Sequence, residues 1–97
     1  MVETTDLILH LKEKWFLQIK HGQKKIEYRE IKPYWTKRIE GRTYDRVVII
    51  RAYPKCRDKS NCLYFKWNGY TTGVLTDHEE MGSCGVYQID LSERLYD

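Results

Sequence analysis

The sequence predicts an α+β fold, a small mixed β-barrel of about five to six strands with two short helices. Ala52 is the one alanine among 97 residues, which disfavours a helix bundle. Eight Tyr and many β-branched residues favour sheet. Both helical patterns lie in the first half of the chain, and the second half alternates like strands. Closing or half-closing six short strands into a barrel would remove their exposed edges.

The chain opens with a strand and a helix. The leucines of residues 6–11 alternate, so they fall on one face of a strand. Residues 12–22 repeat apolar side chains at helical spacing, which predicts an amphipathic helix that buries Trp15 and Phe16 in the core. Gly22 is a natural stop for this helix.

A charged strand, a second helix and a central strand follow. Residues 24–31 have the pattern of a strand edged with charge. Pro33 suits the first turn of a short helix over 33–40. Residues 46–53 are the most hydrophobic segment and predict a central strand.

The second half predicts mainly strands. Residues 62–67 and 70–75 have strand composition, and Asn68-Gly69 between them predicts a hairpin turn. The other segments are a polar loop over 54–61, a loop over 76–85 and a last strand over 86–91.

Length and charge narrow the class of protein. The chain is the size of a single domain, 1–97. The absence of a transmembrane-length apolar run or a signal peptide predicts a cytoplasmic protein without a membrane partner. The net charge of +3 hides an uneven distribution: residues 10–59 carry 15 Lys and Arg against 6 Asp and Glu. Residues 60–97 are acidic, with 2 basic and 6 acidic side chains.

The cysteines predict reduced thiols. Three cysteines cannot all pair, and no C-x-x-C occurs. Cys56, Cys62, His78 and Cys84 could supply four zinc ligands, but their spacing is irregular. We therefore expect no metal and no other cofactor.

Residues 22–29 read G-Q-K-K-I-E-Y-R. This segment resembles the signature G-x-K-x-x-E-x-R of the activating-signal-cointegrator homology (ASCH) family, within the PUA-like superfamily. Gly22, Lys24, Glu27 and Arg29 match all four positions. The preceding L-K-E-K-W-F-L-Q-I-K-H-G is similar to the family's first helix, and the following E-Y-R-E-I-K-P-Y-W is similar to the extended form of a small subgroup that is common in phages and prophages. The resemblance implies a PUA-like barrel.

Strand alternation makes the signature a candidate site independently of the resemblance. Lys25, Glu27, Arg29 and Ile31 should share one strand face, with Lys24 near enough to add a second cation. An acid–base pair facing a cleft is typical of functional sites. The alternative is a solvated strand with an ordinary surface ion pair.

Aromatic side chains interleave with the basic ones, a mixture that suits single-stranded RNA or an unpaired base. The first hypothesis is therefore a module that binds single-stranded RNA or a modified nucleoside or nucleotide in a basic cleft. We expect the acidic loop and tail to lie away from this cleft. The candidate binding residues are Lys24, Lys25, Glu27, Arg29, Lys32, Tyr34, Trp35, Arg51 and Tyr53.

The second hypothesis is a small hydrolase. Some ASCH relatives are amidohydrolases of N4-acetylcytidine that use a Lys, a Thr and a Glu, and others are reported as ribonucleases. The family's Lys falls on Lys24, but its Thr falls on Glu27, so that mechanism lacks a member here. Lys24 and Glu27 would be the catalytic candidates, and Asp77, Glu79 or Glu80 could supply a second acid.

The third hypothesis is a protein-interaction module, such as a fragment of a transcription coactivator. It rests only on the incomplete catalytic set.

The histidines His10, His21 and His78 are expected to have structural or solvent-facing roles. The oligomeric state is left open.

Overall fold

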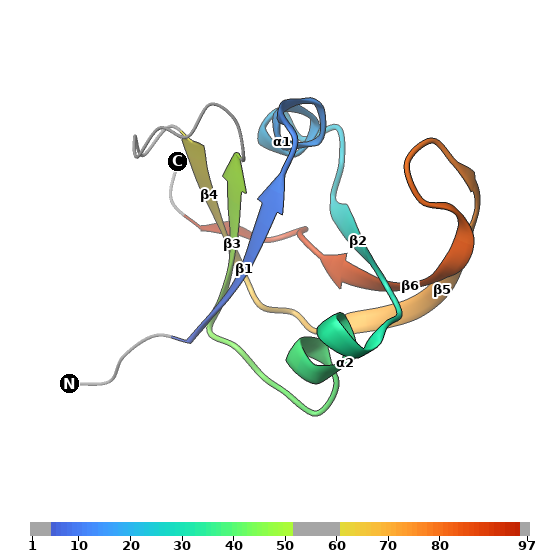
Figure 1. The fold of residues 1–97 in the computed structure, drawn as a ribbon. Coiled ribbons are helices and arrows are strands. Elements are labelled where there is room, and N and C mark those ends of the chain that lie inside the picture. The colour runs from blue at the N-terminus through green and yellow to red at the C-terminus, as the bar shows by residue number, and fades with distance from the viewer. Residues whose placement is uncertain (1–4, 52–60, 96–97) are drawn as a thin grey trace.

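The computed structural model describes residues 5–51 and 61–95, which form two helices and seven strands in two sheets (Figure 1). The α+β class is therefore confirmed. The elements in chain order are β1 (Asp6–Leu11), α1 (Glu13–Lys20), β2 (Ile26–Glu30), α2 (Pro33–Ile39), β3 (Arg46–Arg51), β4 (Cys62–Lys66), β5 (Tyr70–His78), β6 (Gly82–Asp90) and β7 (Arg94–Leu95).

The first sheet has the order β1-β3-β4-β7, with β3 in its interior as predicted. Strands β1 and β3 run parallel, and the other neighbours are antiparallel. Leu7, Leu9 and Leu11 are buried, while His10 is exposed on the opposite face. The alternation within residues 6–11 thus sets which face of β1 meets the core.

The second sheet has the order β2-β6-β5, and both of its pairings are antiparallel. Strands β5 and β6 form a long curved hairpin to the right of β2 (Figure 1). Tyr87 and Ile89 of β6 are fully buried and join the same hydrophobic cluster as Leu9 and Ile49 of the first sheet. The two sheets therefore share one core.

The helices pack against this core through few side chains. Phe16 and Ile19 of α1 are buried, and so is Ile39 at the end of α2. Pro33 occupies the first turn of α2, as predicted, where its missing N–H costs nothing. No helix of residues 5–51 and 61–95 has the length and apolar character needed to cross a membrane.

The Asn68-Gly69 pair does not form a hairpin, so this prediction is wrong. Strand β4 is already paired on both edges, by β3 and β7, which leaves no edge for β5. Gly69 instead adopts a positive φ of 82° where the chain passes from one sheet to the other. Trp67 and Tyr70, on either side of it, both pack against the core.

The predicted loop over 76–85 is also wrong, because β5 continues to His78 and β6 begins at Gly82. Exposed polar side chains and two glycines interrupt the alternation of polar and apolar residues over 76–85, so the sequence did not predict strands there. The register shifts between Leu75 and His78, and Asp77 takes a positive φ of 54° at this irregularity. The two-residue strand β7 was not predicted.

The sequence also predicted a small β-barrel, and the structure differs from that prediction. The described residues form two separate sheets and not a closed barrel. The six strands counted from the sequence are present in part or whole, but their pairing divides them between sheets. Residues 52–53 of the predicted central strand and most of the predicted polar loop lie outside the described residues.

One hydrogen bond joins α2 to the second sheet and can be tested directly. Thr36 Oγ1 and the hydroxyl of buried Tyr87 lie 2.6 Å apart. We expect Tyr87→Phe to lower the free energy of unfolding by about 0.5–1.5 kcal/mol, measured by urea denaturation. Thr36→Val serves as the partner variant. The double variant should be less destabilised than the sum of the single variants, and strict additivity would contradict the bond.

Candidate functional site

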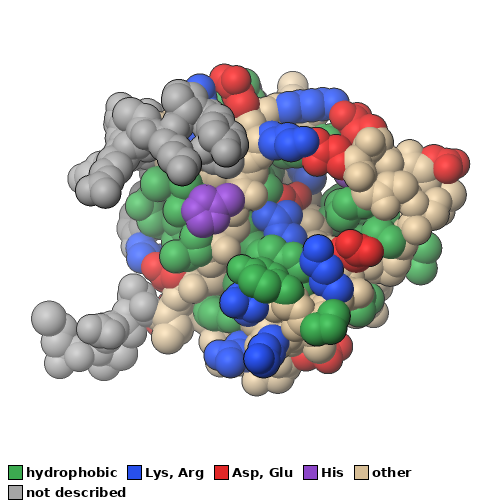
Figure 2. Space-filling model, viewed as in Figure 1, with side chains coloured by type: hydrophobic (Ala, Val, Ile, Leu, Met, Phe, Trp, Pro, Cys, Tyr) green, Lys and Arg blue, Asp and Glu red, His purple; other side chains and the backbone are tan. Residues whose placement is uncertain are grey.

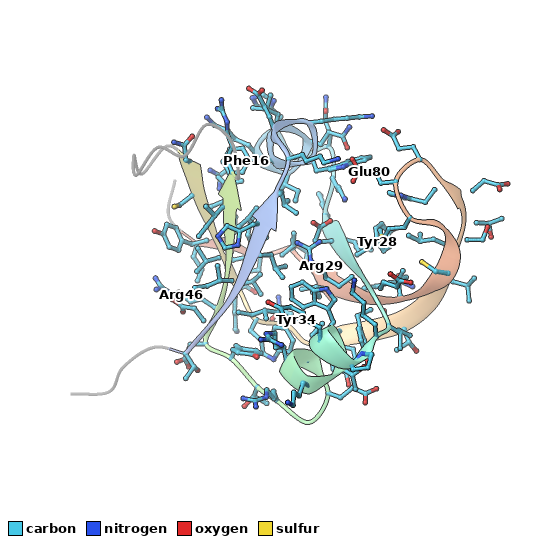
Figure 3. The ribbon with its side chains drawn as sticks, viewed as in Figure 1. Phe16, Tyr28, Arg29, Tyr34, Arg46 and Glu80 are labelled. Carbon is cyan, nitrogen blue, oxygen red and sulfur yellow. The ribbon has the colours of Figure 1, made fainter. Side chains whose placement is uncertain are left out.

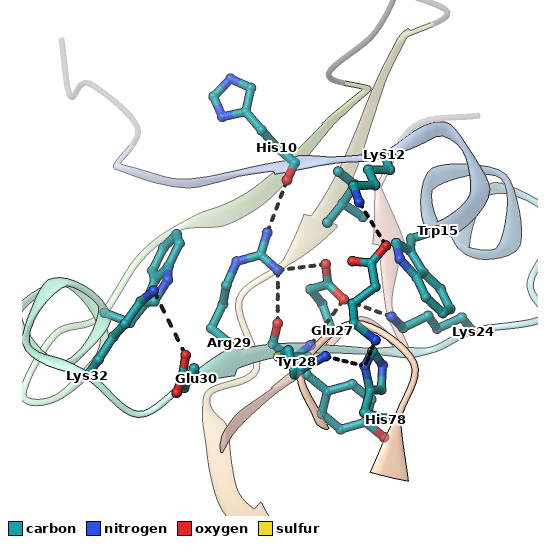
Figure 4. A pocket seen from close by; sticks show the side chains of 14 residues that line it. His10, Lys12, Trp15, Lys24, Glu27, Tyr28, Arg29, Glu30, Lys32 and His78 are labelled. Atoms are coloured by element: carbon teal, nitrogen blue, oxygen red, sulfur yellow. Dashed lines mark hydrogen bonds and ion pairs between the residues drawn. The ribbon is translucent and has the colours of Figure 1, made fainter. Parts of the chain in front are cut away.

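A buried carboxylate held by two cations forms the centre of the site (Figure 4). Glu27 is only 3% exposed. Lys24 Nζ lies 2.8 Å from its Oε1, and Arg29 Nη1 lies 2.9 Å from its Oε2. The backbone N–H of Tyr28 also donates to Oε1 at 3.1 Å. The sequence-based pairing of these three charges is therefore confirmed.

Local structure explains why these side chains meet. Glu27 and Arg29 are two positions apart on β2, so both project from the same face of the strand. Lys24 precedes β2, and its backbone N–H donates to Gln18 O at the end of α1. The positive φ of Gly22, 76°, lets the chain turn between helix and strand.

Arg29 connects the cluster to two further elements. Its Nη1 also donates to Tyr28 O at 2.9 Å, and its Nη2 donates to His10 O on β1 at 3.3 Å. Its guanidinium lies over the Trp35 ring of α2, 5.1 Å from the ring centre. Arg29 has five N–H groups, so these bonds leave two of them for another acceptor.

Aromatic rings line the pocket beside this cluster. Lys24 Nζ lies 4.6 Å from the centre of the Trp15 ring and 5.4 Å from that of Tyr28. The cavity volume is about 290 Å³. Its lining residues are His10, Leu11, Lys12, Trp15, Lys24, Glu27, Tyr28, Arg29, Glu30, Lys32, Trp35, His78, Glu80 and Met81.

The β5–β6 hairpin contributes His78 to this pocket, although the sequence predicted only a structural or solvent-facing role. Its Nδ1 accepts from the backbone N–H groups of Glu80 and Met81 at 3.1 and 3.2 Å. Nδ1 is therefore the accepting nitrogen of this ring, and Nε2 is the nitrogen left for a further partner. The ring centre lies 5.7 Å from that of Trp15 and 6.4 Å from that of Tyr28.

The acidic hairpin tip does not lie away from the pocket, so the expectation is wrong for the acidic loop; Asp90 and Glu93 of the tail do not line the pocket. Glu80 pairs with Lys12 at 3.1 Å, and Glu79 pairs with Lys14. The physical reason is opposite charge: the two carboxylates meet the two lysines around the start of α1. The Lys12 ammonium, and after it the Trp15 side chain, hold the pKa of Glu80 below its usual value.

The other predicted binding residues divide into three groups. Lys32 and Trp35 line the pocket, and Tyr34 lines a neighbouring one. Lys25 does not join the cluster: its side chain is exposed and lines a separate hollow near Tyr70. Arg51 also lies outside it and pairs with Glu13 at 3.1 Å. Tyr53 lies outside the described residues.

Sequence reasoning missed Trp15 and His78 as site residues, and it named Glu80 only as one of three candidates for a second acid. Trp15 was placed in the core by its helical spacing, and it does pack against the core while also facing the pocket. The signal that could have marked it is Lys14 directly beside it. His78 and Glu80 reach the pocket only through the β5–β6 pairing, which no local pattern shows.

Metal ligation finds no support in the part of the chain that the structure describes. No group of three or more His, Cys, Asp or Glu side chains there could hold a metal ion. Cys62 and Cys84 are free thiols, and Cys56 lies outside the described residues.

Comparison of the chain with protein-family models, with curated proteins and with solved structures found no match. The ASCH resemblance therefore stays a prediction.

The charge cluster should contribute strongly to stability. Removing one partner of a buried ion pair leaves the others uncompensated, at a cost of about 3–5 kcal/mol. We expect Glu27→Ala to lower the free energy of unfolding by about this amount in urea denaturation. Glu30→Ala, three residues along and exposed, is the control and should change it by less than about 0.5 kcal/mol. Equal effects would show that Glu27 is no more than a surface charge.

The Lys12–Glu80 pair should be visible in the titration of Glu80. A carboxyl whose pKa is lowered in the folded state stabilises the fold above its unfolded pKa, and this contribution disappears as the pH falls through the lowered value. We expect NMR titration to give a lower pKa for Glu80 in the wild-type chain than in Lys12→Ala. Lys37→Ala, which removes a distant exposed cation, should leave the Glu80 titration unchanged. An unchanged value in Lys12→Ala would refute the pairing.

Proposed function

We propose that this protein binds single-stranded RNA, or a modified nucleoside or nucleotide, in the pocket beside Glu27. The observation that carries the proposal is the combination of two cations, Lys24 and Arg29, with three aromatic rings around one small cavity. Aromatic faces stack on bases, and Lys and Arg neutralise phosphates. An ion pair with a purely structural role would not require three aromatic rings beside it.

The size of the pocket limits the ligand. At about 290 Å³ it lies at the lower end of the range for small-molecule sites, about 300–1,000 Å³. Such a volume suits one base with its sugar. It does not suit a duplex, whose bases are stacked within a helix and would have to be splayed out to enter.

The ASCH resemblance supports the same assignment. The signature residues Lys24, Glu27 and Arg29 are the residues whose charges meet in the pocket. We propose that the chain is a divergent ASCH protein and that its two sheets are an open form of a PUA-like barrel.

A hydrolase that uses Lys24 and Glu27 is the second candidate, favoured by their 2.8 Å contact at the pocket. Lys24 Nζ also lies over the rings of Trp15 and Tyr28. In a hydrolase, Lys24 would stabilise a developing oxyanion, and Glu27 would carry the proton. Single-turnover assays with N4-acetylcytidine and with labelled RNA test this candidate, and activity unchanged in both Lys24→Ala and Glu27→Ala would exclude it.

Binding is best tested by titrating the protein with each of the four nucleoside monophosphates and with a random-sequence RNA hexamer pool. The change in tryptophan fluorescence is the readout, and it is measured at several salt concentrations. We expect the logarithm of the association constant for the hexamer to fall by about 0.7 per phosphate contacted for each tenfold rise in salt. Trp15→Ala should weaken binding about 5- to 100-fold through loss of stacking.

Lys24→Met should also weaken binding, whereas Lys20→Met, an exposed neighbour on α1, is the matched control and should not. Circular dichroism verifies that each variant is folded. Absence of binding at low salt, or binding that neither salt nor Lys24→Met changes, would refute the proposed function.

A further inference from the structure

A second hollow adjoins the pocket on its α2 side. It has a cavity volume of about 570 Å³ and extends from β1 to α2. In Figure 3, Tyr34 and Arg29 lie close together between β1 and α2. Figure 2 shows a central hydrophobic group on this face with Lys and Arg side chains around it.

The two cavities share a wall made of His10, Arg29 and Trp35. Arg29 carries the positive charge of this wall and lies over the Trp35 ring. Its two uncommitted N–H groups can meet an acceptor at the boundary between the cavities. A guanidinium at such a boundary suits a phosphate that links two nucleotides.

The second hollow also offers a stacking surface. Tyr34 is 53% exposed, which is unusual for so large a ring. The Arg38 guanidinium lies 3.6 Å from the centre of the Tyr34 ring, and its Nη1 donates to Tyr34 O at 2.8 Å. The Trp35 ring also contacts the Tyr34 ring, with 4.8 Å between the two centres. These contacts hold Tyr34 and Arg38 together, so a base that stacks on the part of the Tyr34–Arg38 pair left exposed needs little further ordering.

The charge of the hollow is positive. Asp6 is its single acidic lining residue, and it is held by Arg46 through two bonds of 3.0 and 2.8 Å. Arg38 makes no ion pair with a carboxylate within residues 5–51 and 61–95. Its charge is available to an anionic ligand.

We infer that this hollow is a second nucleotide subsite, in which Tyr34 and Arg38 hold the nucleotide next to the one in the Glu27 pocket. This inference rests on the proposed function and sharpens it. The natural ligand is then a single strand of at least two nucleotides, and not a free nucleoside. The linking phosphate crosses the wall at Arg29.

The experiment compares ligands of different length on the full chain. The probes are the four nucleoside monophosphates, a random-sequence RNA dinucleotide pool and RNA and DNA hexamer pools. We expect dinucleotides to bind more tightly than monophosphates. Tyr34→Ala should weaken dinucleotide and hexamer binding about 5- to 100-fold and leave monophosphate binding unchanged. Tyr34→Phe keeps the ring and should keep the affinity.

A charge-matched pair of variants tests Arg38. Arg38→Ala should weaken hexamer binding, whereas Lys37→Ala removes the same charge from the next residue of α2, outside the hollow, and should have a smaller effect. The RNA and DNA pools show whether the sugar is discriminated.

Each failure has a distinct signature. If monophosphates bind but dinucleotides bind no more tightly, the second subsite is refuted and the proposed function stands. If Tyr34→Ala weakens the binding of monophosphates and of hexamers equally, or changes neither affinity, the second subsite is again refuted. If no probe binds, both proposals fail.

Discussion

The buried carboxylate of Glu27 is the constraint on which the arrangement of this site depends. A carboxylate withdrawn from water is costly unless charges and hydrogen bonds replace its hydration. Lys24 supplies one charge from the turn after α1, and Arg29 supplies the other from β2. Arg29 in turn contacts β1 through His10 O and α2 through the Trp35 ring. Satisfying one carboxylate therefore joins four elements around the pocket.

The hydrophobic core also contacts α1 and α2, the two helices beside the pocket. Phe16 anchors α1 and Ile39 anchors α2, and neither side chain is exposed by more than 1%. The bond between Thr36 and Tyr87 fixes α2 to the second sheet. The helix that presents Tyr34 and Trp35 is thus supported by core packing, by this bond and by the contact of Arg29 with the Trp35 ring.

Local patterns predicted much of the fold and the centre of the site. The leucine alternation of β1, the hydrophobic run of β3 and Pro33 at the start of α2 each act within a few residues, and so does the spacing of Lys24, Glu27 and Arg29. The division into two sheets was not predicted, because it depends on which strand edges are already occupied. Glu80 reaches Lys12 across 68 positions of sequence through the β5–β6 pairing.

Ion pairs make the surroundings of the pocket less positive than the basic composition of residues 10–59 suggests. The pocket lining carries four Lys and Arg side chains and three Glu, a formal charge of +1. Glu79 and Glu80 of the hairpin tip offset Lys14 and Lys12, so part of the basic excess seen in the sequence is balanced beside the pocket. A net lining charge of +1 contributes little to the long-range attraction of a polyanion. Under the proposed function, recognition at the pocket would therefore depend on short-range contacts with the N–H groups of Arg29 and Lys24 and with the flanking rings.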